Sequence, residues 1–546
     1  MFKILVADSL PAAAIGRYNN SRGITVDNKA GISSGDLMEI LPRYDALVIR
    51  SRTKVTKEIL QRAGKLKIIG RAGAGVDNID TAEATQRGII VMNTPGGNTV
   101  AATEHTIAMM LAALRNIPGA NISMREGKWD RKTYMGREIF EKTIGVIGLG
   151  KIGREVARRL TAFGAKIIGY DPILTKEMAD RLGVELVGLK ELLRRSDIIT
   201  MHAPRIPETQ NMINAEHLRL CKDGVVIVNC ARGGIVNEQD LLQALNSGKV
   251  ANAAVDVYES EPPLNWELAK HPKVVATPHL GASTEEAQTK VADQILEQII
   301  EYHRKNVALN AVNFISVDEK MQPIIAPYFE LAERLGRLFS QIRAGRLKEV
   351  AIRFYGKITQ FPDSPIASHL MAGALRSGGS EEASHDVDLL NMVNSLTIAR
   401  DKGINIEITR KDQPLTSFTN LIACDFHTEL GMVHLAGTVY AKDIYRLVEF
   451  DKYDADVDLS GKMIIIENED VPGVIGKVGT ILGEHNINIS HFSSHRIKAD
   501  KTAANIFNVE GDLNSGLQKE LETISEVKQV LLANIGESNT ANSRET

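Results

Sequence analysis

The sequence contains few cysteines and no long hydrophobic run. Cys221, Cys230 and Cys424 are the only three cysteines among 546 residues, and none forms a Cys-x-x-Cys pair, which argues against a disulfide scaffold and against a thiolate zinc site. No apolar run approaches the ~20 residues that span a bilayer, and Met1–Asp8 reads as a strand rather than a signal-peptide core. We therefore expect a reduced, cytoplasmic setting, no membrane association and no metal centre.

The sequence also lacks an excess of charge of either sign. The sequence has 65 Lys and Arg against 68 Asp and Glu, a net charge of −3, which argues against nucleic acid as a partner. Hydrophobic residues make up 43% and charged residues 24%, which excludes a disordered or fibrous chain. At roughly 100–200 residues per domain, a chain of 546 residues forms three or four domains.

The first 300 residues alternate short apolar runs with segments of helical period, a pattern that predicts parallel α/β sheets. The alternation restarts at Thr143, after the long helical segment Ala102–Arg115, and a second long helical segment, Thr284–Arg304, closes the region. This order predicts two doubly wound domains. The second (99–284) is inserted into the first (1–98 plus 285–305).

The remaining chain has a different pattern. Residues 306–460 are expected to form an α+β domain, in which Phe361–Asp386, rich in Ser, Gly, Pro and His, is predicted to be a loop. Residues 461–536 read as strand, helix, two strands, helix and strand, the βαββαβ unit. The polar tail 537–546 is expected to be disordered.

A glycine-rich loop provides the strongest single motif. Gly148, Gly150 and Gly153 form GxGxxG between an apolar strand and an amphipathic helix. In this motif the first glycine permits a tight turn, the second lets a pyrophosphate approach the backbone, and the third brings helix and strand together. Asp171, after the next strand, suits a ribose 2′-hydroxyl and repels a 2′-phosphate. We therefore predict a Rossmann-type NAD domain, beside a flavodoxin-like first domain; the alternative is a glycine-tight turn with a capping aspartate.

Three further strands of the nucleotide domain lead into Arg232, Glu261 and His279. Parallel strands end at one sheet edge, so these side chains can converge. Histidine can take and return a hydroxyl proton during hydride transfer, a neighbouring carboxylate fixes its tautomer, and a guanidinium binds an α-hydroxy carboxylate. We predict His279 as the acid/base, Glu261 as its partner and Arg232 as the carboxylate anchor, although each alone is compatible with an ordinary loop role.

Other residues near these strand ends have less definite readings. Asp256 either contacts the nicotinamide side or is a buried structural aspartate. Cys230 is rejected as a covalent nucleophile, because hydride transfer needs none. The backbone amides of Gly70–Asp77 either hold a substrate carboxylate or form a plain turn.

These motifs resemble the D-isomer-specific 2-hydroxyacid dehydrogenases over nearly all the chain. The matching segments are Gly148–Gly153 with Asp171, His202–Pro204, Asn229–Gly234, Asp256–Pro263 and Pro278–Thr284. The resemblance implies the same three catalytic residues. It also implies cofactor contacts at Gly148, Gly150, Lys151, Ile152, Gly153, Asp171, Cys230, Ala231, Arg232, Asp256, His279, Gly281 and Ala282.

On the substrate side, the resemblance is to members that oxidise 3-phosphoglycerate to 3-phosphohydroxypyruvate, the first step of serine synthesis. A substrate with a carboxylate and a phosphate needs more than one arginine. Arg50 and Arg52, two apart in an extended segment, are candidates for the phosphate, with Asn98 as a neutral donor. The predicted substrate-binding residues are Arg50, Ser51, Arg52, Gly73, Ala74, Gly75 and Asn98. Ala74 and Ala203 stand where relatives often carry larger or hydroxyl-bearing residues.

Residues 461–536 resemble the ACT regulatory domain, and the region before them resembles the family's intervening allosteric domain. In this family the ACT domain binds serine at a domain interface, which implies an L-serine effector site with Asn468, Asp470 and Asn488. The alternatives are that Asp470 only caps a helix and that the unit serves only assembly. The family suggests a homotetramer, or at least a dimer.

Two other functions remain open at this point. One is a glyoxylate or hydroxypyruvate reductase, which the appended regulatory unit disfavours. The other is a non-catalytic NAD-sensing protein, which the complete Arg, Glu and His set and the absence of basic tracts disfavour.

Overall fold

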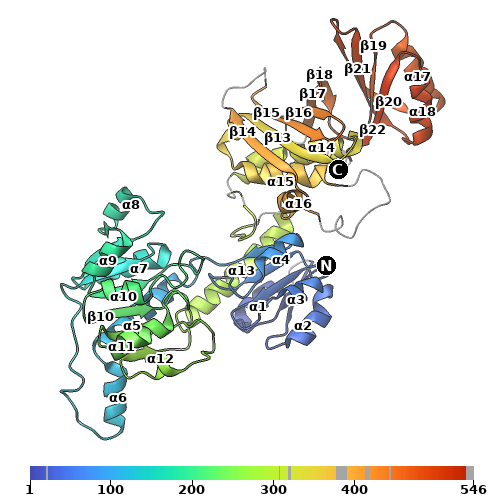
Figure 1. The fold of residues 1–546 in the computed structure, drawn as a ribbon. Coiled ribbons are helices and arrows are strands. Elements are labelled where there is room, and N and C mark those ends of the chain that lie inside the picture. The colour runs from blue at the N-terminus through green and yellow to red at the C-terminus, as the bar shows by residue number, and fades with distance from the viewer. Residues whose placement is uncertain are drawn as a thin grey trace.

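The computed structural model describes residues 1–19, 23–305, 308–315, 317, 321–376, 390–411, 418–441 and 444–536. Four sheets form four successive units, and Figure 1 shows the nucleotide unit at one end of the molecule and the ACT-like unit at the other. The predicted fold class, two parallel-sheet domains followed by an α+β domain and a βαββαβ domain, is confirmed. The expected disorder of 537–546 lies outside the described residues.

The first unit is a five-stranded parallel sheet in the order β2-β1-β3-β4-β5. Its strands are β1 (Phe2–Val6), β2 (Ile24–Asn28), β3 (Ala46–Ile49), β4 (Ile68–Arg71) and β5 (Ile90–Met92). Its helices are α1 (Ala12–Tyr18), α2 (Ser34–Ile40), α3 (Lys57–Gln61), α4 (Thr81–Gln86) and, from much later in the chain, α13 (Glu285–Lys305). Ile295 and Ile299 of α13 are fully buried in the core of this sheet, so the late helix completes the first domain.

The nucleotide unit is a seven-stranded parallel sheet in the order β12-β11-β10-β9-β6-β7-β8. Its strands are β6 (Thr143–Ile147), β7 (Lys166–Tyr170), β8 (Glu185–Leu186), β9 (Ile198–Met201), β10 (Val225–Asn229), β11 (Val250–Val255) and β12 (Val274–Ala276). Its helices are α5 (Thr99–Leu114), α6 (Ile117–Arg125), α7 (Lys151–Ala162), α8 (Lys176–Arg181), α9 (Leu189–Arg195), α10 (Ala215–Leu220), α11 (Glu238–Asn246) and α12 (Glu267–Lys270). Strands such as β10 are buried along their whole length, as expected for a sheet with helices on both faces.

The third unit is a six-stranded mixed sheet in the order β14-β13-β15-β16-β17-β18. Its strands are β13 (Leu347–Gly356), β14 (Asn405–Lys411), β15 (Asn420–Thr428), β16 (Met432–Ala441), β17 (Ile444–Phe450) and β18 (Tyr453–Asp458), and its α-helices are α14 (Gln322–Ile342), α15 (Asp363–Ala374) and α16 (Ser395–Asp401).

The loop predicted over Phe361–Asp386 is wrong for its first half. Asp363–Ala374 is the helix α15, while 377–386 lie outside the described residues. Small residues permit the close packing of this helix: a side chain added at Gly336 of α14 would overlap the carbonyl oxygen of Leu370, and one at Gly373 would overlap that of Glu333. Gly373, one of the residues that suggested a loop, therefore serves helix–helix contact.

The last unit is confirmed as βαββαβ: β19 (Lys462–Glu469), α17 (Val474–Glu484), β20 (Asn488–Ile497), β21 (Thr502–Glu510), α18 (Ser515–Glu522) and β22 (Val527–Asn534). The sheet order is β20-β21-β19-β22. Gln341 of α14 joins this unit to the preceding one, because its side chain accepts from the Asn534 amide (2.7 Å) and donates to the Asn534 carbonyl (3.0 Å).

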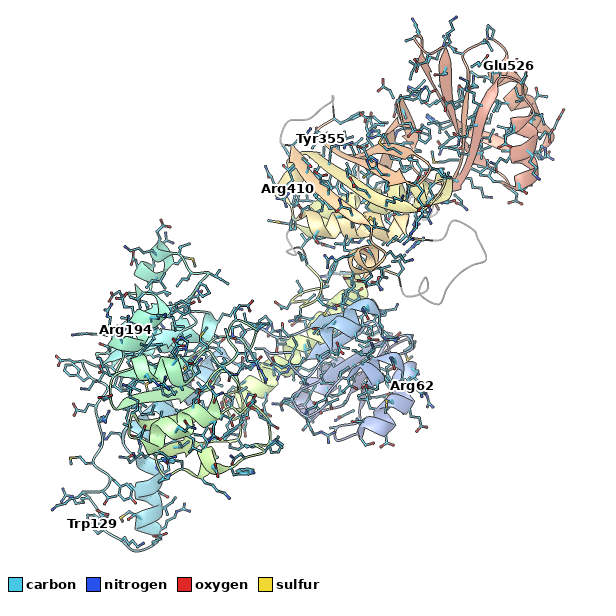
Figure 2. The ribbon with its side chains drawn as sticks, in the orientation of Figure 1. Arg62, Trp129, Arg194, Tyr355, Arg410 and Glu526 are labelled. Atoms are coloured by element: carbon cyan, nitrogen blue, oxygen red, sulfur yellow. The ribbon has the colours of Figure 1, made fainter. Side chains whose placement is uncertain are left out.

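Among the described residues, none of the helices combines the length and the hydrophobicity that a membrane-spanning helix needs. The loop after α6 projects from the nucleotide unit, and Figure 2 shows Trp129 at its tip, where this indole is 75% exposed.

Candidate active site

The predicted acid/base pair forms at the carboxyl edge of the nucleotide sheet. The Nδ1 atom of His279 lies 2.7 Å from Oε2 of Glu261, and both side chains are partly exposed. Burial, the largest single effect, raises the pKa of Glu261, but the hydrogen bond and charge of His279 and the Tyr258 amide together hold this pKa below the usual value. Glu261 is therefore ionised at neutral pH and leaves Nε2 of His279 available for a substrate.

His279 has an unusual backbone conformation. Its φ of +54° lies in the left-handed region, which non-glycine residues occupy rarely and often at functional sites. Its amide donates to the carbonyl of Asp256 (2.8 Å), and the next two amides, of Leu280 and Gly281, donate to the Asp256 carboxylate at 2.8 and 2.9 Å. The end of β11 thus fixes the turn that carries the imidazole.

The predicted anchor, Arg232, lies with this pair beside one cavity of about 300 Å³. Its Nε donates to Asp77 at 3.0 Å, and the Asn229 side chain donates to its carbonyl oxygen. Gly75 leaves room for the guanidinium, because a side chain at this position would overlap it. Arg232 therefore joins the two domains beside the cavity.

All seven predicted substrate-binding residues line that cavity: Arg50, Ser51, Arg52, Gly73, Ala74, Gly75 and Asn98. Asp8 organises the arginine segment by accepting from the Arg50 amide (2.6 Å) and from Nε of Arg52 (3.4 Å). The Oδ1 atom of Asn98 is buried and has no hydrogen-bond partner among the described residues. An unpaired buried oxygen beside a cavity is available to a ligand.

A fourth arginine of this cavity, Arg71, escaped the sequence analysis. It ends strand β4, and its Nε has no hydrogen-bond partner among the described residues. Burial, and then the neighbouring charge of Arg232, lower its pKa to about 10, so it stays cationic at neutral pH. The strand-end rule that located Arg232 applies equally to Arg71, and this was the available signal.

The glycine loop has the shape that a bound pyrophosphate requires. Gly148 has φ +88° and lies against the carbonyl oxygen of His202. A side chain at Gly153 would overlap the Gly148 carbonyl, whereas no atom in the described ranges lies within 4 Å of the position of a Cβ at Gly150. The first and third glycines are thus needed by the fold, and the second faces open space.

Asp171 lies directly beside this loop. Its carboxylate accepts from the Leu149 amide at 2.8 Å and from the Ile173 and Leu174 amides at 2.9 and 3.1 Å. The residues present therefore fit a dinucleotide with a free ribose 2′-hydroxyl.

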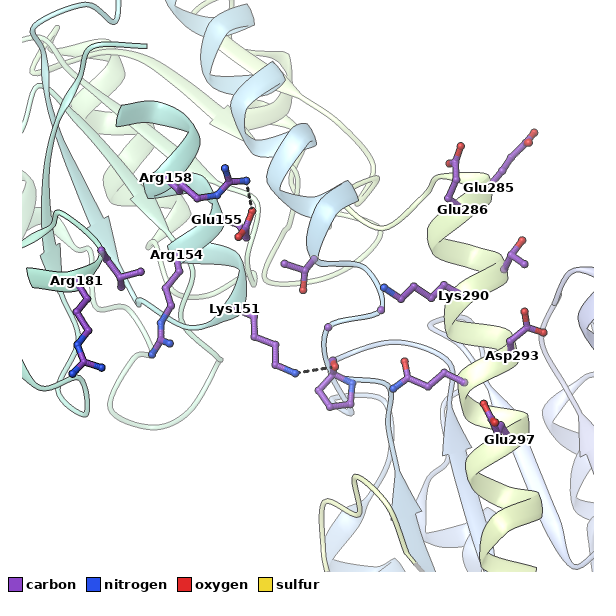
Figure 3. A pocket seen from close by; sticks show the side chains of 17 residues that line it. Lys151, Arg154, Glu155, Arg158, Arg181, Glu285, Glu286, Lys290, Asp293 and Glu297 are labelled. Carbon is purple, nitrogen blue, oxygen red and sulfur yellow. Dashed lines mark hydrogen bonds and ion pairs between the residues drawn. The ribbon is translucent and has the colours of Figure 1, made fainter. Parts of the chain in front are cut away.

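A second, larger cleft of about 1320 Å³ separates α7 from α13. Figure 3 shows Lys151, Arg154 and Arg158 on the nucleotide side, opposite acidic side chains of α13 that include Glu286 and Asp293. Lys151 crosses the cleft, with its ammonium group 3.1 Å from the carbonyl oxygen of Pro95. The two walls therefore carry opposite charge.

Four further cofactor candidates lie along the same sheet edge, with different orientations. Ile152 and Cys230 pack against the core of the nucleotide sheet. Burial, and then Asp256, raise the pKa of the Cys230 thiol to about 12, so this thiol is protonated at neutral pH. Ala231 follows β10 between Cys230 and Arg232, and Ala282 lines the 300 Å³ cavity.

The structure does not bring the three effector candidates together within one chain. Asn468 is buried and hydrogen-bonded to Asn505 (2.6 Å), and Asp470 pairs with Arg496 at 2.8 Å. Asn488 begins β20, whereas Arg496 is near its end. At ~3.3 Å per residue, these two positions lie about 26 Å apart.

The glycine loop, the His–Glu pair and the arginine-lined cavity define the class of protein. Family profiles agree: D-isomer specific 2-hydroxyacid dehydrogenase, NAD binding domain, matches residues 107–281. The profile of the D-3-phosphoglycerate dehydrogenase intervening domain matches 324–451, and that of the ACT domain matches 462–526. The chain therefore carries the NAD-binding domain of the 2-hydroxyacid dehydrogenase class.

Relatives that align over most of their length identify the family within this class. D-3-phosphoglycerate dehydrogenase of Archaeoglobus fulgidus is 43% identical over 89% of this chain and 91% of its own length. The protein of the same name from Bacillus subtilis is 37% identical over 98% of this chain and 100% of its own length. The chain belongs to the D-3-phosphoglycerate dehydrogenase family.

Solved structures resemble the first two domains. A glyoxylate reductase from Paecilomyes thermophila is 32% identical with a TM-score of 0.53, covering 57% of this chain and 98% of that chain. D-lactate dehydrogenase from Aquifex aeolicus, complexed with NAD and lactic acid, is 26% identical with a TM-score of 0.51, covering 57% of this chain and 100% of that chain.

Proposed function

We propose that this protein oxidises 3-phospho-D-glycerate to 3-phosphohydroxypyruvate with NAD, the first step of L-serine synthesis. One observation carries the choice of substrate. The cavity beside the His279–Glu261 pair is lined by four arginines, Arg50, Arg52, Arg71 and Arg232, against a single acidic lining residue. The ion pairs of Arg52 with Asp8 and of Arg232 with Asp77 balance part of this charge. A substrate with a carboxylate at one end and a phosphate at the other balances the rest better than a small monoanion does.

Each residue of the site has its own role in the reaction. Arg232 binds the substrate carboxylate and lies where charge changes on the hydroxyl oxygen. His279 accepts the hydroxyl proton at Nε2 while its Nδ1–H donates to Glu261, whose negative charge stabilises the imidazolium. Arg50, Arg52 and Arg71 hold the phosphate. When bound, NAD accepts the hydride from the carbon that bears the hydroxyl.

The cofactor is held by this chain's glycine loop and by the strand ends beyond it. The amides that follow Gly150 at the start of α7 bind the pyrophosphate. Asp171 accepts from the adenosine ribose, and its negative charge disfavours a 2′-phosphate. Asp256 and the turn 279–282 form the nicotinamide side.

The direct test is a spectrophotometric assay of NADH formation with 3-phosphoglycerate, run beside the reverse reaction with phosphohydroxypyruvate and with hydroxypyruvate. We expect kcat/KM to favour the phosphorylated substrate by at least ten-fold. A preference for hydroxypyruvate or glyoxylate would instead identify a reductase of unphosphorylated acids. NAD binding with no turnover of any of these acids would identify a nucleotide-sensing protein.

The proposal extends to L-serine as an effector and to a cytosolic homotetramer. Asp470 pairs with Arg496 near the end of β20, Asn488 begins this strand, and β20 is an edge strand of its sheet. We therefore expect antiparallel approach of two β20 strands to place Asp470 of one copy near Asn488 of the other. Three free cysteines support a reduced compartment. Calorimetric titration with L-serine tests the effector, with Asp470→Ala as the variant, and light scattering tests the assembly.

A further inference from the structure

A histidine outside the predicted site contacts the aspartate that fixes the catalytic turn. The Nε2 atom of His105, on α5, lies 3.1 Å from Oδ1 of Asp256 and 3.3 Å from Oγ1 of Thr277. Asp256 is completely buried, and His105 is 19% exposed. His105 lines neither the cleft between α7 and α13 nor the 300 Å³ cavity.

Asp256 uses its carboxylate to hold the backbone around His279. Oδ1 accepts from the Thr277 hydroxyl (2.6 Å) and the Leu280 amide (2.8 Å), while Oδ2 accepts from the Gly281 amide (2.9 Å). The left-handed conformation of His279 lies inside this set of bonds. A conformation of this kind persists only when surrounding contacts enforce it.

The carboxylate can do this only while it is ionised and oriented. The titratable groups around it are His105, Cys230, Tyr258, Glu261 and His279. The imidazole of His279 is paired with Glu261, whereas that of His105 lies 3.1 Å from the Asp256 carboxylate. Burial, the largest single effect, opposes ionisation of Asp256, but the hydrogen bonds from His105, Thr277 and the Leu280 amide, together with the charge of His105, keep its pKa below the usual value. Without the imidazole, a buried carboxylate loses one partner and protonates more readily.

We propose that His105 is a positioning residue for the reaction. Its Nε2–H donates to Asp256, and Asp256 in turn holds the 279–281 turn so that the His279 imidazole meets the substrate hydroxyl. His105 touches neither substrate nor cofactor. The expected effect of His105 on kcat rests on the proposed function, whereas its effect on the backbone of residues 279–281 does not.

The test compares three variants of the full-length protein. His105→Leu removes the donor, His105→Gln retains an N–H at similar reach, and Glu104→Gln changes the exposed neighbour on the same helix. We expect His105→Leu to lower kcat by about 10- to 100-fold and to move the acid limb of the kcat profile to higher pH. His105→Gln should recover most of kcat and the wild-type profile, and Glu104→Gln should match the wild type.

Hydrogen exchange of the peptide containing Leu280 and Gly281 provides a readout without substrate. These amides should exchange at least ten-fold faster in His105→Leu and at the wild-type rate in His105→Gln. If His105→Leu does not fold, His105→Asn, whose shorter amide cannot reach Asp256, replaces it.

Two results would overturn the proposal: unchanged exchange and pH profile in His105→Leu, or equal losses in the Leu and Gln variants, which would indicate packing alone. Wild-type protein that turns over no 2-hydroxy acid would refute the proposed function, and the exchange data would still decide the role of His105.

Discussion

At the scale of single residues, the site combines a strained histidine with a surplus of positive charge. His279 is held in a left-handed conformation by backbone bonds to Asp256, and its Nδ1 is occupied by Glu261. The imidazole therefore has a fixed direction and one available nitrogen before any substrate binds. Preorganisation of this kind removes a reorganisation cost from the chemical step.

Replacing the acid/base should separate chemistry from binding. We expect His279→Ala to lower kcat by about 10²–10⁴-fold, because proton transfer then falls to water, while the dissociation constant for NAD changes little. NADH absorbance measures the first quantity and fluorescence titration the second. His271→Ala, at the end of α12, is the matched control. Retained turnover in His279→Ala would show that another group moves the proton.

The cavity arginines should act on the phosphate. We expect Arg71→Ala to raise KM for the phosphorylated substrate by about 10- to 100-fold, the value of one or two charged hydrogen bonds. Turnover of hydroxypyruvate should change much less, because this substrate has no phosphate to lose. Arg62→Ala, an exposed arginine of the same domain, is the control. Equal effects on both substrates would assign Arg71 to the carboxylate or to the fold.

At the scale of elements, the turn between β6 and α7 contains one glycine that the packing of the fold requires and another that we expect to serve cofactor binding. Gly153 is required by the packing of α7 on Gly148, whereas Gly150 faces open space. We expect Gly150→Ala to leave the urea unfolding curve nearly unchanged while weakening NAD binding at least ten-fold, because the added methyl occupies the approach of the pyrophosphate. Unaltered NAD affinity would place the cofactor elsewhere.

Gly153→Ala is the matched variant, because it adds the same methyl to the same turn. Its methyl would overlap a backbone carbonyl, so we expect a loss of roughly 1–3 kcal/mol in the free energy of unfolding. Urea denaturation of both proteins measures this difference. A Gly153→Ala protein as stable as Gly150→Ala would contradict the packing role assigned to this glycine.

Elements also show how far the sequence predicted the site. Arg232, Glu261 and His279 were predictable because residues at the ends of parallel strands meet at one edge whatever the loop lengths. His105 was not predictable in this way, since the group that a mid-helix residue contacts depends on how α5 packs across β11 and β12. Helix α15 was missed because glycine, serine and proline in its sequence favour loops locally, and tertiary packing overrides that preference.

At the scale of the whole molecule, the third unit and the ACT-like unit are connected to the active site through the first domain. Asn391 donates to the Gly88 carbonyl (2.9 Å) and Asn394 to that of Gln86 (3.0 Å), both at the end of α4. The ACT-like sheet in turn joins α14 through Gln341. The described contacts thus lead from the C-terminal unit to the substrate domain, which supplies three of the cavity arginines.

We expect the junction at Asn391 and the junction at Gln341 to open independently of each other. We expect Asn391→Ala to increase hydrogen exchange in residues 86–92, and Gln341→Ala to increase it in residues 530–536, each through loss of about 1 kcal/mol per hydrogen bond. Mass spectrometry of the exchanged peptides distinguishes the two regions, and each variant is the control for the other. Simultaneous loosening of both regions in either variant would indicate one cooperative body instead.

The return of α13 to the first sheet has a consequence for synthesis on the ribosome. Strands β1 to β5 emerge first, yet Ile295 and Ile299, which cover them, come some two hundred residues after β5. The inserted nucleotide sheet is complete by Ala276. Helix α1 covers part of the same face early, but the part that α13 covers stays exposed in the nascent chain until every strand of the nucleotide sheet has been synthesised.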